Sequence, residues 1–225
     1  MRVRLAGHLI EADSYHRIEE IFIHPDFKWH GNVTSSDIAL LRLAGPVEFN
    51  KFIGPICLPE EETSFLGRTA VVSGWGTLKH GVPMLPSSLQ KVEVPLISND
   101  ICRSWISSHN LTKTETPKLL DSMICSGFEE GGKSPCHGDS GGALILNDNG
   151  RAQVIGVVSW GVACASPKAP GVYTKVSSFA DWINDVMRDF SRAAGPPRES
   201  ATALQPLAIN DEDRTLTPEN VNALR

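Results

Sequence analysis

Apolar and polar residues alternate in short runs along the middle of the chain. The clearest runs are Ile38–Leu43, Thr69–Trp75, Leu89–Leu96 and Val154–Trp160. Alternation with a period of two residues is typical of strands that bury one face. Gly, Pro, Ser and Asn separate the runs, as they do in turns. Many short strands joined by turns predict an antiparallel β-barrel architecture.

Two segments have the periodicity of a helix instead. Near the end of the chain, apolar residues recur at three- and four-residue steps after a start signal made by Ser178 and Asp181. These apolar residues are Phe179, Trp182, Ile183, Val186, Met187 and Phe190. We expect this helix to close a barrel. A shorter helix is expected over Ser98–Trp105, because Ser98, Asn99 and Asp100 are good first residues of a helix.

The chain changes character after Phe190. Residues 191–225 contain four prolines and mixed charge, but no aromatic residue and no cysteine. Such a composition cannot bury much apolar surface. We therefore expect a folded domain over residues 1–190 and a linker or disordered tail over 191–225, with one helical turn started by Thr217, Pro218 and Glu219.

Composition narrows the class of protein without identifying it. The 225 residues are 41% hydrophobic and include 19 Gly and 15 Pro, which describes a globular, turn-rich chain with one sizeable core or two small ones. The net charge of -5 gives no basic footprint for nucleic acid. No apolar run is long enough to span a membrane, and residues 1–5 lack the apolar stretch of a secretory signal.

The run Gly138-Asp139-Ser140-Gly141-Gly142 is the strongest chemical signal in the sequence. An oxyanion hole needs backbone N–H groups turned toward one point, and glycines leave room for an incoming peptide. Gly138 and Ser140 are the candidate N–H donors, and the Ser140 hydroxyl is the candidate nucleophile. A serine also needs a general base and a carboxylate that orients it, and Asp37 fits the last role. Taken alone, the run also fits an ordinary glycine-rich turn.

The surroundings of this run resemble the chymotrypsin/trypsin family of serine endopeptidases at many separated places. The matching stretches, in order, are Val3–Leu5, Ile23–Pro25, Asp37–Leu43, Ile56–Pro59, Ser73–Gly76, Met123–Gly127, the serine run, Val158–Gly161 and Pro170–Val176. Their order and spacing agree with the family from about residue 3 to residue 190. The resemblance implies two antiparallel six-stranded β-barrels and a C-terminal helix. It also implies hydrolysis of peptide bonds through an acyl-enzyme on Ser140, with Asp37 as the orienting acid and no cofactor.

The family's general-base histidine has no counterpart here. It lies in an Ala-Ala-His-Cys-like segment about 45 residues before the acid, whereas only 36 residues precede Asp37. His8, His16, His24 and His30 are better interpreted as surface or strand residues. The activation site is also missing; in the family its new amino terminus pairs with the aspartate that matches Asp139. We expect an incomplete first barrel and a chain that is inactive alone.

Three explanations of the missing segment are open. The chain is a fragment of an active enzyme, an alternative product, or a protease homologue that has lost catalysis and serves as a binding or scaffold module. We favour the first, because Ser140, Asp37 and the glycines are all kept. Upstream coding sequence would decide between an enzyme and a silent homologue.

The resemblance also implies the substrate pocket. Ser134 matches its base, Ser159, Trp160 and Gly161 one wall, and Gly171 the other wall. An uncharged, open pocket suits a large apolar or aromatic side chain. Pro135, His137 and Ala163 depart from the usual pattern and affect the pocket's width and mouth. If the alignment slips by one residue, Lys133 approaches the base and favours acidic side chains.

The five cysteines are the last feature of the sequence that bears on function. The resemblance pairs Cys102 with Cys125 and Cys136 with Cys164, while Ala70 and Leu146 occupy the positions of a further bridge that many relatives have. Cys57 is left over; it either tethers an upstream pro-segment or light chain, or is a buried thiol. Paired cysteines and the N-glycosylation acceptors at Asn32 and Asn110 favour an extracellular, zymogen-derived protein. We expect no metal site, because Gly7 stands where calcium-binding relatives have an acidic ligand and the nearby acids form a solvated face.

Overall fold

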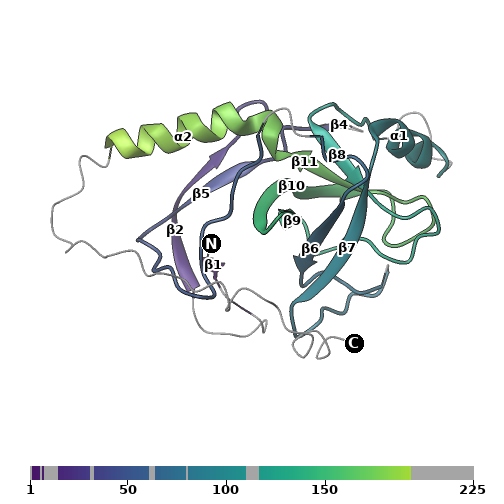
Figure 1. Cartoon of the computed structure of the whole chain (residues 1–225), viewed down its shortest axis with the longest axis horizontal. Coiled ribbons are helices and arrows are strands. Elements are labelled where there is room, and N and C mark those ends of the chain that lie inside the picture. Colours follow the sequence, from purple (N-terminus) through teal and green to yellow (C-terminus); the bar gives the residue numbers. More distant parts are fainter. Residues whose placement is uncertain are drawn as a thin grey trace. The chain divides into compact units, whose positions relative to one another are not determined.

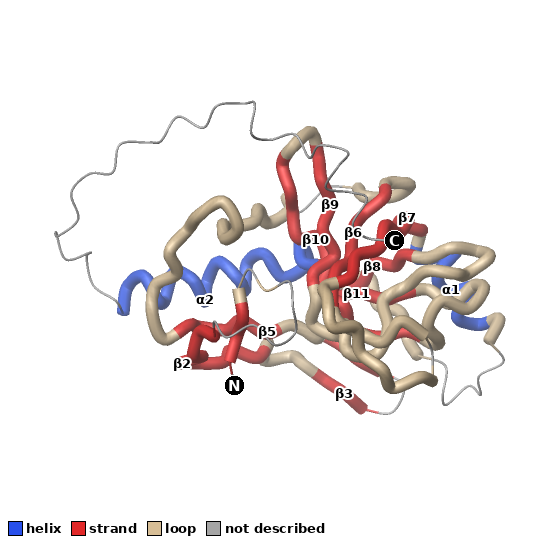
Figure 2. Tube along the Cα trace, turned by 90° about the horizontal axis from the view of Figure 1, so that it is seen from below, coloured by secondary structure: helices blue, strands red, loops and turns tan. Residues whose placement is uncertain are grey.

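The computed structural model describes residues 2–5, 7, 15–30, 33–60, 64–79, 81–109 and 117–193. Residues 1–187 form one compact unit and residues 188–225 a second one. Within the second unit only residues 188–193 are described, so the expected tail and its helical turn at Thr217–Glu219 lie almost entirely outside the described residues. Strands and loops make up most of the described chain (Figure 2).

Six antiparallel strands close into one barrel (Figure 1). The strands are β6 (Thr69–Gly74), β7 (Gln90–Ile97), β8 (Met123–Ser126), β9 (Ala143–Asp148), β10 (Arg151–Gly161) and β11 (Gly171–Lys175). Their order around the barrel is β10-β11-β8-β7-β6-β9. The β9–β10 hairpin turns at Asn149 and Gly150, whose φ angles are +50° and +85°, and Asn-Gly is the residue pair that favours such a turn. The expected strands are therefore confirmed with ends that shift by a few residues.

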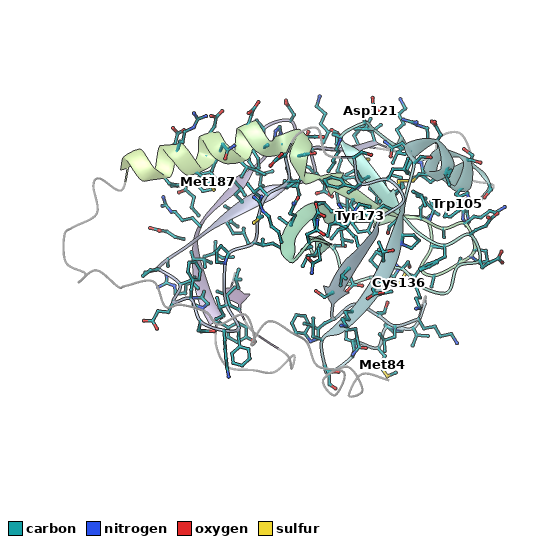
Figure 3. The ribbon with its side chains drawn as sticks, in the orientation of Figure 1. Met84, Trp105, Asp121, Cys136, Tyr173 and Met187 are labelled. Carbon is teal, nitrogen blue, oxygen red and sulfur yellow. A yellow bond between two sulfur atoms is a disulfide. The ribbon has the colours of Figure 1, made fainter. Side chains whose placement is uncertain are left out.

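Alternating residues of these strands fill the barrel interior. Val72 on β6, Val94 on β7, Leu144 on β9 and Ile155 on β10 are at most 2% exposed and pack in one cluster. Tyr173 on β11 is fully buried in the same cluster and is labelled in Figure 3. Ala70 and Leu146, which replace a bridge present in many relatives, are also members of this cluster. Apolar packing thus occupies the place of that bridge.

The first part of the chain forms an open sheet of three strands. Strands β1 (Arg2–Arg4), β2 (Tyr15–Ile23) and β5 (Ala39–Leu43) pair in the order β1-β2-β5. Between them, β3 (Lys28–His30) and β4 (Val33–Ser35) make a separate two-stranded hairpin. The described strands on this side do not close, so the expectation that they belong to an incomplete first barrel stays a prediction.

The two faces of the β2–β5 pair differ in burial. Leu40 packs against a cluster that contains Ile38 and residues of the C-terminal helical segment. On the opposite face Ile21, Ile23 and Leu41 are 46%, 61% and 43% exposed. Packing of this face fixes the start of β5 next to the barrel. The preceding Asp37 is thereby held there too.

Both expected helices are present. Helix α1 (Asn99–Ser107) begins after Ser98, whose hydroxyl accepts a hydrogen bond from the Ile101 N–H at 3.2 Å. Helix α2 (Ala180–Ala193) follows a 3₁₀ turn at Val176–Phe179, so the helix proper begins slightly later than Ser178. None of the helices among the described residues is long and apolar enough to cross a membrane.

Candidate active site

Ser140 lies on a tight loop between Cys136 and the start of β9. The Asp139 N–H donates to the Cys136 carbonyl at 3.0 Å, and the Gly142 N–H donates to the Asp139 carbonyl at 2.9 Å. Gly138 has a φ of +97°, a conformation that strains other residues. The Gly141 N–H donates to the Val158 carbonyl of β10 at 2.9 Å, which fastens the loop to the barrel wall. The Ser140 side chain is left exposed.

The backbone at Gly138 and Ser140 suits the oxyanion role that the sequence suggests. Within the described part of the chain, neither of their N–H groups donates a hydrogen bond to the protein. Both groups belong to the loop that presents the Ser140 hydroxyl. Unpaired backbone donors beside a nucleophile are the components of an oxyanion hole.

The Asp139 side chain contacts the chain segment at the end of β6. Its carboxylate accepts hydrogen bonds from the Gly76 N–H and the Cys136 N–H, each at 2.8 Å. A Cβ on Gly74 or Gly76 would collide with this carboxylate, so glycines are needed at both places. Asp139 also lines a cavity of about 390 Å³, and none of the ion pairs found among the described residues includes it.

Asp37 precedes β5 and is tied to the barrel by two hydroxyl groups. The Ser159 Oγ donates to the Asp37 carboxylate at 2.6 Å, and the Thr174 Oγ1 donates to the Asp37 backbone carbonyl at 2.7 Å. Ser159 lies on β10 and Thr174 on β11. The half-buried carboxylate is therefore fixed in place by residues far away in the sequence.

Asp37 and Ser140 open onto the same cavity. Its volume is about 460 Å³, and Ile23, Phe27, Ala39, Leu41 and Val157 contribute apolar walls. The space between a carboxylate and a serine hydroxyl is where a general base has to lie in a Ser-His-Asp arrangement. None of the described histidines lines this cavity.

The histidines lie elsewhere. His24 packs against Phe179 and Trp182, with ring centroids 5.0 and 4.9 Å apart, which is a structural role. The His109 Nε2 lies 2.8 Å from the Lys168 carbonyl. His16 is on β2 and His30 is on β3. His8 and His80 are outside the described residues.

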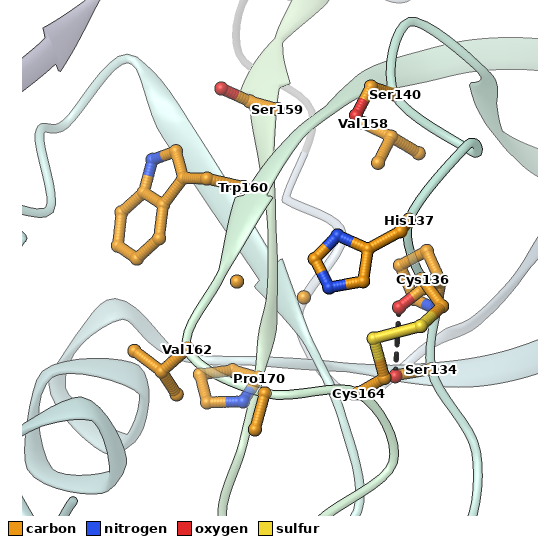
Figure 4. Close-up of a pocket in the computed structure, with 14 residues that line it drawn as sticks. Ser134, Cys136, His137, Ser140, Val158, Ser159, Trp160, Val162, Cys164 and Pro170 are labelled. Atoms are coloured by element: carbon orange, nitrogen blue, oxygen red, sulfur yellow. Dashed lines mark hydrogen bonds between the residues drawn. A yellow bond between two sulfur atoms is a disulfide. The ribbon is translucent and has the colours of Figure 1, made fainter. Parts of the chain in front are cut away.

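Ser140 lines a second cavity as well, of about 250 Å³, which Figure 4 shows. All five residues expected from the sequence line it: Ser134, Ser159, Trp160, Gly161 and Gly171. The structure adds further wall residues, among them Pro135, His137, Val158, Ala163, Cys164 and Pro170. Of these, Pro135, His137 and Ala163 stood out in the sequence as departures from the family pattern.

Ser134, the residue that we expect at the base of this second cavity, carries no charge. The Ser134 hydroxyl donates to the Pro135 carbonyl at 2.9 Å and accepts from the Ala165 N–H at 2.7 Å. Lys133 is exposed and lines the cavity of Asp139, which Ser134 lines too, whereas Lys133 is not among the residues that line the second cavity. Burial raises the pKa of Tyr173, whose hydroxyl is 2.7 Å from the Ser126 Oγ, so this phenol stays neutral.

The described residues contain two disulfides. Cys136 and Cys164 join two walls of the second cavity, and Cys102 joins α1 to Cys125 on β8, as the resemblance implies. Cys57 is free and half-buried, and its sulfur accepts a hydrogen bond from the Arg151 Nε at 3.2 Å. Asn32 and Asn110 lie outside the described residues. The described residues hold no cluster of three acidic, His or Cys side chains suited to a metal, and Glu19 and Glu20 pair with Arg42.

Comparison with known proteins places the chain in a family. The family model described as "Trypsin" matches residues 1–183. Trypsin-1 of Astacus astacus is 42% identical over 166 residues, which are 74% of this chain and 65% of that protein. The serine proteinase stubble of Drosophila melanogaster is 40% identical over 74% of the chain and 20% of its own length, and human testisin is 40% identical over 76% and 52%. The chain therefore covers less than two thirds of each of these relatives. Together with the serine loop and the closed barrel, the match shows that this chain belongs to the trypsin family.

Proposed function

We propose that the chain is the catalytic part of a serine endopeptidase, a hydrolase of peptide bonds with Ser140 as nucleophile. The observation that supports this proposal most directly is that Ser140 lines two cavities. Asp37 lines the first cavity, and the second is a walled space for a substrate side chain whose lining residues include no Asp, Glu, Lys or Arg. The candidate nucleophile Ser140 therefore adjoins both the cavity of the candidate orienting acid and the candidate substrate pocket.

The reaction follows from these positions. The Ser140 hydroxyl loses its proton to a base and attacks the substrate carbonyl carbon, and the Gly138 and Ser140 N–H groups stabilise the negative oxygen that forms. The base then returns the proton to the leaving amine, which leaves an acyl group on Ser140. Water, deprotonated by the same base, releases the acid product and restores the serine. No cofactor takes part.

The base itself is the part that the described residues do not supply. We propose a histidine imidazole in the cavity between Asp37 and Ser140, held in the correct tautomer by the Asp37 carboxylate. No described histidine reaches this cavity, so we expect the 225-residue chain to be inactive by itself. Loss of the triad histidine costs about 10⁶ in rate in subtilisin. If no such histidine is encoded with this chain, it is a silent homologue that serves as a binding module.

The pocket supports a preference for large apolar side chains before the cut bond. Gly161 and Gly171 leave its walls open, and Ser134 gives it an uncharged base. A lysine or arginine side chain would lose its hydration there without gaining a carboxylate partner. We propose cleavage after Phe, Leu and other large apolar residues.

The surroundings of Asp139 support the proposal that the enzyme is activated by proteolysis. Asp139 lines a cavity, and among the described residues the hydrogen-bond partners of its carboxylate are backbone N–H groups. We propose that a new amino terminus enters this cavity and pairs with Asp139, as the resemblance implies for zymogens.

The accompanying proposals are an incomplete first barrel that includes β1, β2 and β5, a folded domain over residues 1–190, a tail over 191–225, and an extracellular location. Cys57 remains the candidate tether for a pro-segment or light chain.

The experiment that tests this function needs the gene's upstream residues that carry the proposed histidine. The extended, activated protein is assayed on a peptide library varied only at the residue before the cut. We expect kcat/KM to be highest for Phe or Leu and to vanish in Ser140→Ala. Preference for Arg or Lys would contradict the pocket assignment, and an absence of turnover with the histidine in place would favour the binding module.

A further inference from the structure

A buried hydroxyl on β11 contacts the main chain of the candidate orienting acid. Tyr173 on β11 belongs to the barrel cluster, and the next residue, Thr174, faces the opposite way, because side chains alternate along a strand. Thr174 is only 2% exposed. Its Oγ1 donates to the Asp37 backbone carbonyl at 2.7 Å, although the two residues are 137 positions apart. This bond ties the barrel wall to the segment that carries Asp37.

The backbone of Asp37 is itself part of a tight turn. The Ile38 N–H donates to the Ser36 carbonyl at 2.8 Å, which closes a three-residue turn with Asp37 at its centre. Ser36 has a φ of +49°, a left-handed conformation that residues other than glycine rarely adopt. Ile38 is 8% exposed and packs in a cluster with Val176 and Phe179. A strained turn of this kind persists only where the surrounding structure fixes it, and the bond from Thr174 is one such constraint.

Two hydroxyl groups from neighbouring strands thus hold Asp37 at two points. The Ser159 Oγ on β10 donates to the carboxylate, whereas the Thr174 Oγ1 on β11 donates to the main chain. Val157 of β10 pairs with Thr174, so the two donors lie on paired strands. A bond to the carboxylate alone leaves the backbone free to shift. The second bond limits rotation of the peptide group next to the Cα atom that carries the side chain.

From this arrangement we infer that Thr174 is a positioning residue, which acts through the Asp37 main chain and fixes where the Asp37 carboxylate lies in the cavity shared with Ser140. The inference rests on the proposed function, in which this carboxylate orients the histidine that takes the proton from Ser140. A misplacement of about 1 Å in an active site lowers a rate by up to about 100-fold. Even a small shift of Asp37 therefore affects turnover.

Three variants of the extended, activated protein test this role. Thr174→Val removes the donor and keeps the branched shape, Thr174→Ser keeps the donor, and Ser177→Ala removes a buried hydroxyl that has no hydrogen-bond partner among the described residues. We expect kcat for a Phe peptide to fall about tenfold or more in Thr174→Val, with KM within about twofold of the parent. In Thr174→Ser and Ser177→Ala, kcat should stay within about threefold of the parent.

The pH dependence distinguishes a displaced acid from a partly unfolded protein. A carboxylate beside an imidazole raises the pKa of the imidazole, because it stabilises the protonated form. Among the described residues that line the shared cavity, Asp37 is the only ionisable one. A displaced Asp37 raises the imidazole pKa less, so the acid limb of the kcat/KM profile should move to lower pH in Thr174→Val and stay in place in Thr174→Ser. A smaller folded fraction would lower the whole profile without moving this limb.

An unchanged acid limb in Thr174→Val, whatever its kcat, would overturn the inference and leave the proposed function intact. An equal loss of kcat in Thr174→Val and Thr174→Ser would overturn it too, because the donor would then not be the cause. If Thr174→Val does not fold, Thr174→Ala removes the same donor and replaces it in the assay. Failure of both to fold would show that the hydroxyl serves the fold rather than the position of Asp37. Absence of turnover in the parent would instead contradict the proposed function, and the inference with it.

Discussion

At the scale of single residues, we expect charge and shape in the cavity beside Ser140 to decide what the proposed enzyme cleaves. Ser134 lines both this cavity and the cavity of Asp139, whereas its neighbour Lys133 lines the cavity of Asp139 and not this one. The two adjacent residues thus differ in whether they reach the proposed substrate cavity. A carboxylate can therefore be introduced at Ser134 as the test and at Lys133 as its control.

Ser134→Asp should create cleavage after Arg and Lys. The new carboxylate would pair with a cationic side chain in a space that the substrate shields from water, where a charge pair is worth more than in solution. We expect kcat/KM for an Arg peptide to rise by about 100-fold or more and that for Phe to fall. Lys133→Asp places the same charge outside the cavity and should give no gain; a similar gain in both variants would refute the assignment of the base.

At the scale of elements, the ends of strands and their connecting loops hold the site together. Gly76 follows β6 and donates to Asp139, and a Cβ at Gly76 would collide with the same carboxylate. The loop of Ser140 is thereby coupled to a strand end that is remote in the sequence. Helix α1 is joined to β8 in a similar way by Cys102 and Cys125.

Gly76→Ala should displace Asp139 and disturb the Ser140 loop. A buried contact of this kind has no free space to relax into, and overpacking costs about 1–3 kcal/mol. We expect a lower Tm and a loss of kcat with little change in the P1 preference. The control is Gly54→Ala, where the new Cβ meets nothing within 4 Å. If both variants behave like the parent in thermal unfolding and kinetics, the coupling is absent.

Removal of the Cys102–Cys125 bridge tests the link between α1 and the barrel. The two cysteines are 23 residues apart, and a closed loop of this size is worth about 3 kcal/mol in the chain-entropy account. The double variant Cys102→Ala/Cys125→Ala should therefore unfold at clearly lower denaturant concentration than the parent. An unchanged midpoint in guanidinium chloride would show that packing alone holds α1 in place.

At the scale of the whole molecule, local patterns predicted the barrel better than they predicted the first sheet. Alternation identified strands such as β6 and β10 because one face of each is buried in the barrel cluster. The open sheet was harder to predict, because Ile21, Ile23 and Leu41 have an apolar pattern and are yet exposed. A sequence pattern shows that a face is apolar, but it does not show what covers that face.

The candidate site was predictable where a motif places its residues next to one another. Gly138, Asp139 and Ser140 are consecutive, and the lining of the substrate cavity followed from the resemblance. Contacts between remote residues were not predictable in this way. The hydrogen bond from Ser159 to Asp37 joins residues 122 positions apart, and the bond from Thr174 to Asp37 joins residues 137 positions apart.

We propose that Ser140 becomes a nucleophile only when a histidine occupies the cavity that it shares with Asp37. The most direct measurement is labelling with a fluorophosphonate, followed by mass spectrometry of the labelled peptide. We expect an adduct on Ser140 in the extended, activated protein, none in its Ser140→Ala variant, and none in the 225-residue chain alone. Equal labelling of the 225-residue chain, or an adduct on another residue of the extended protein, would contradict it.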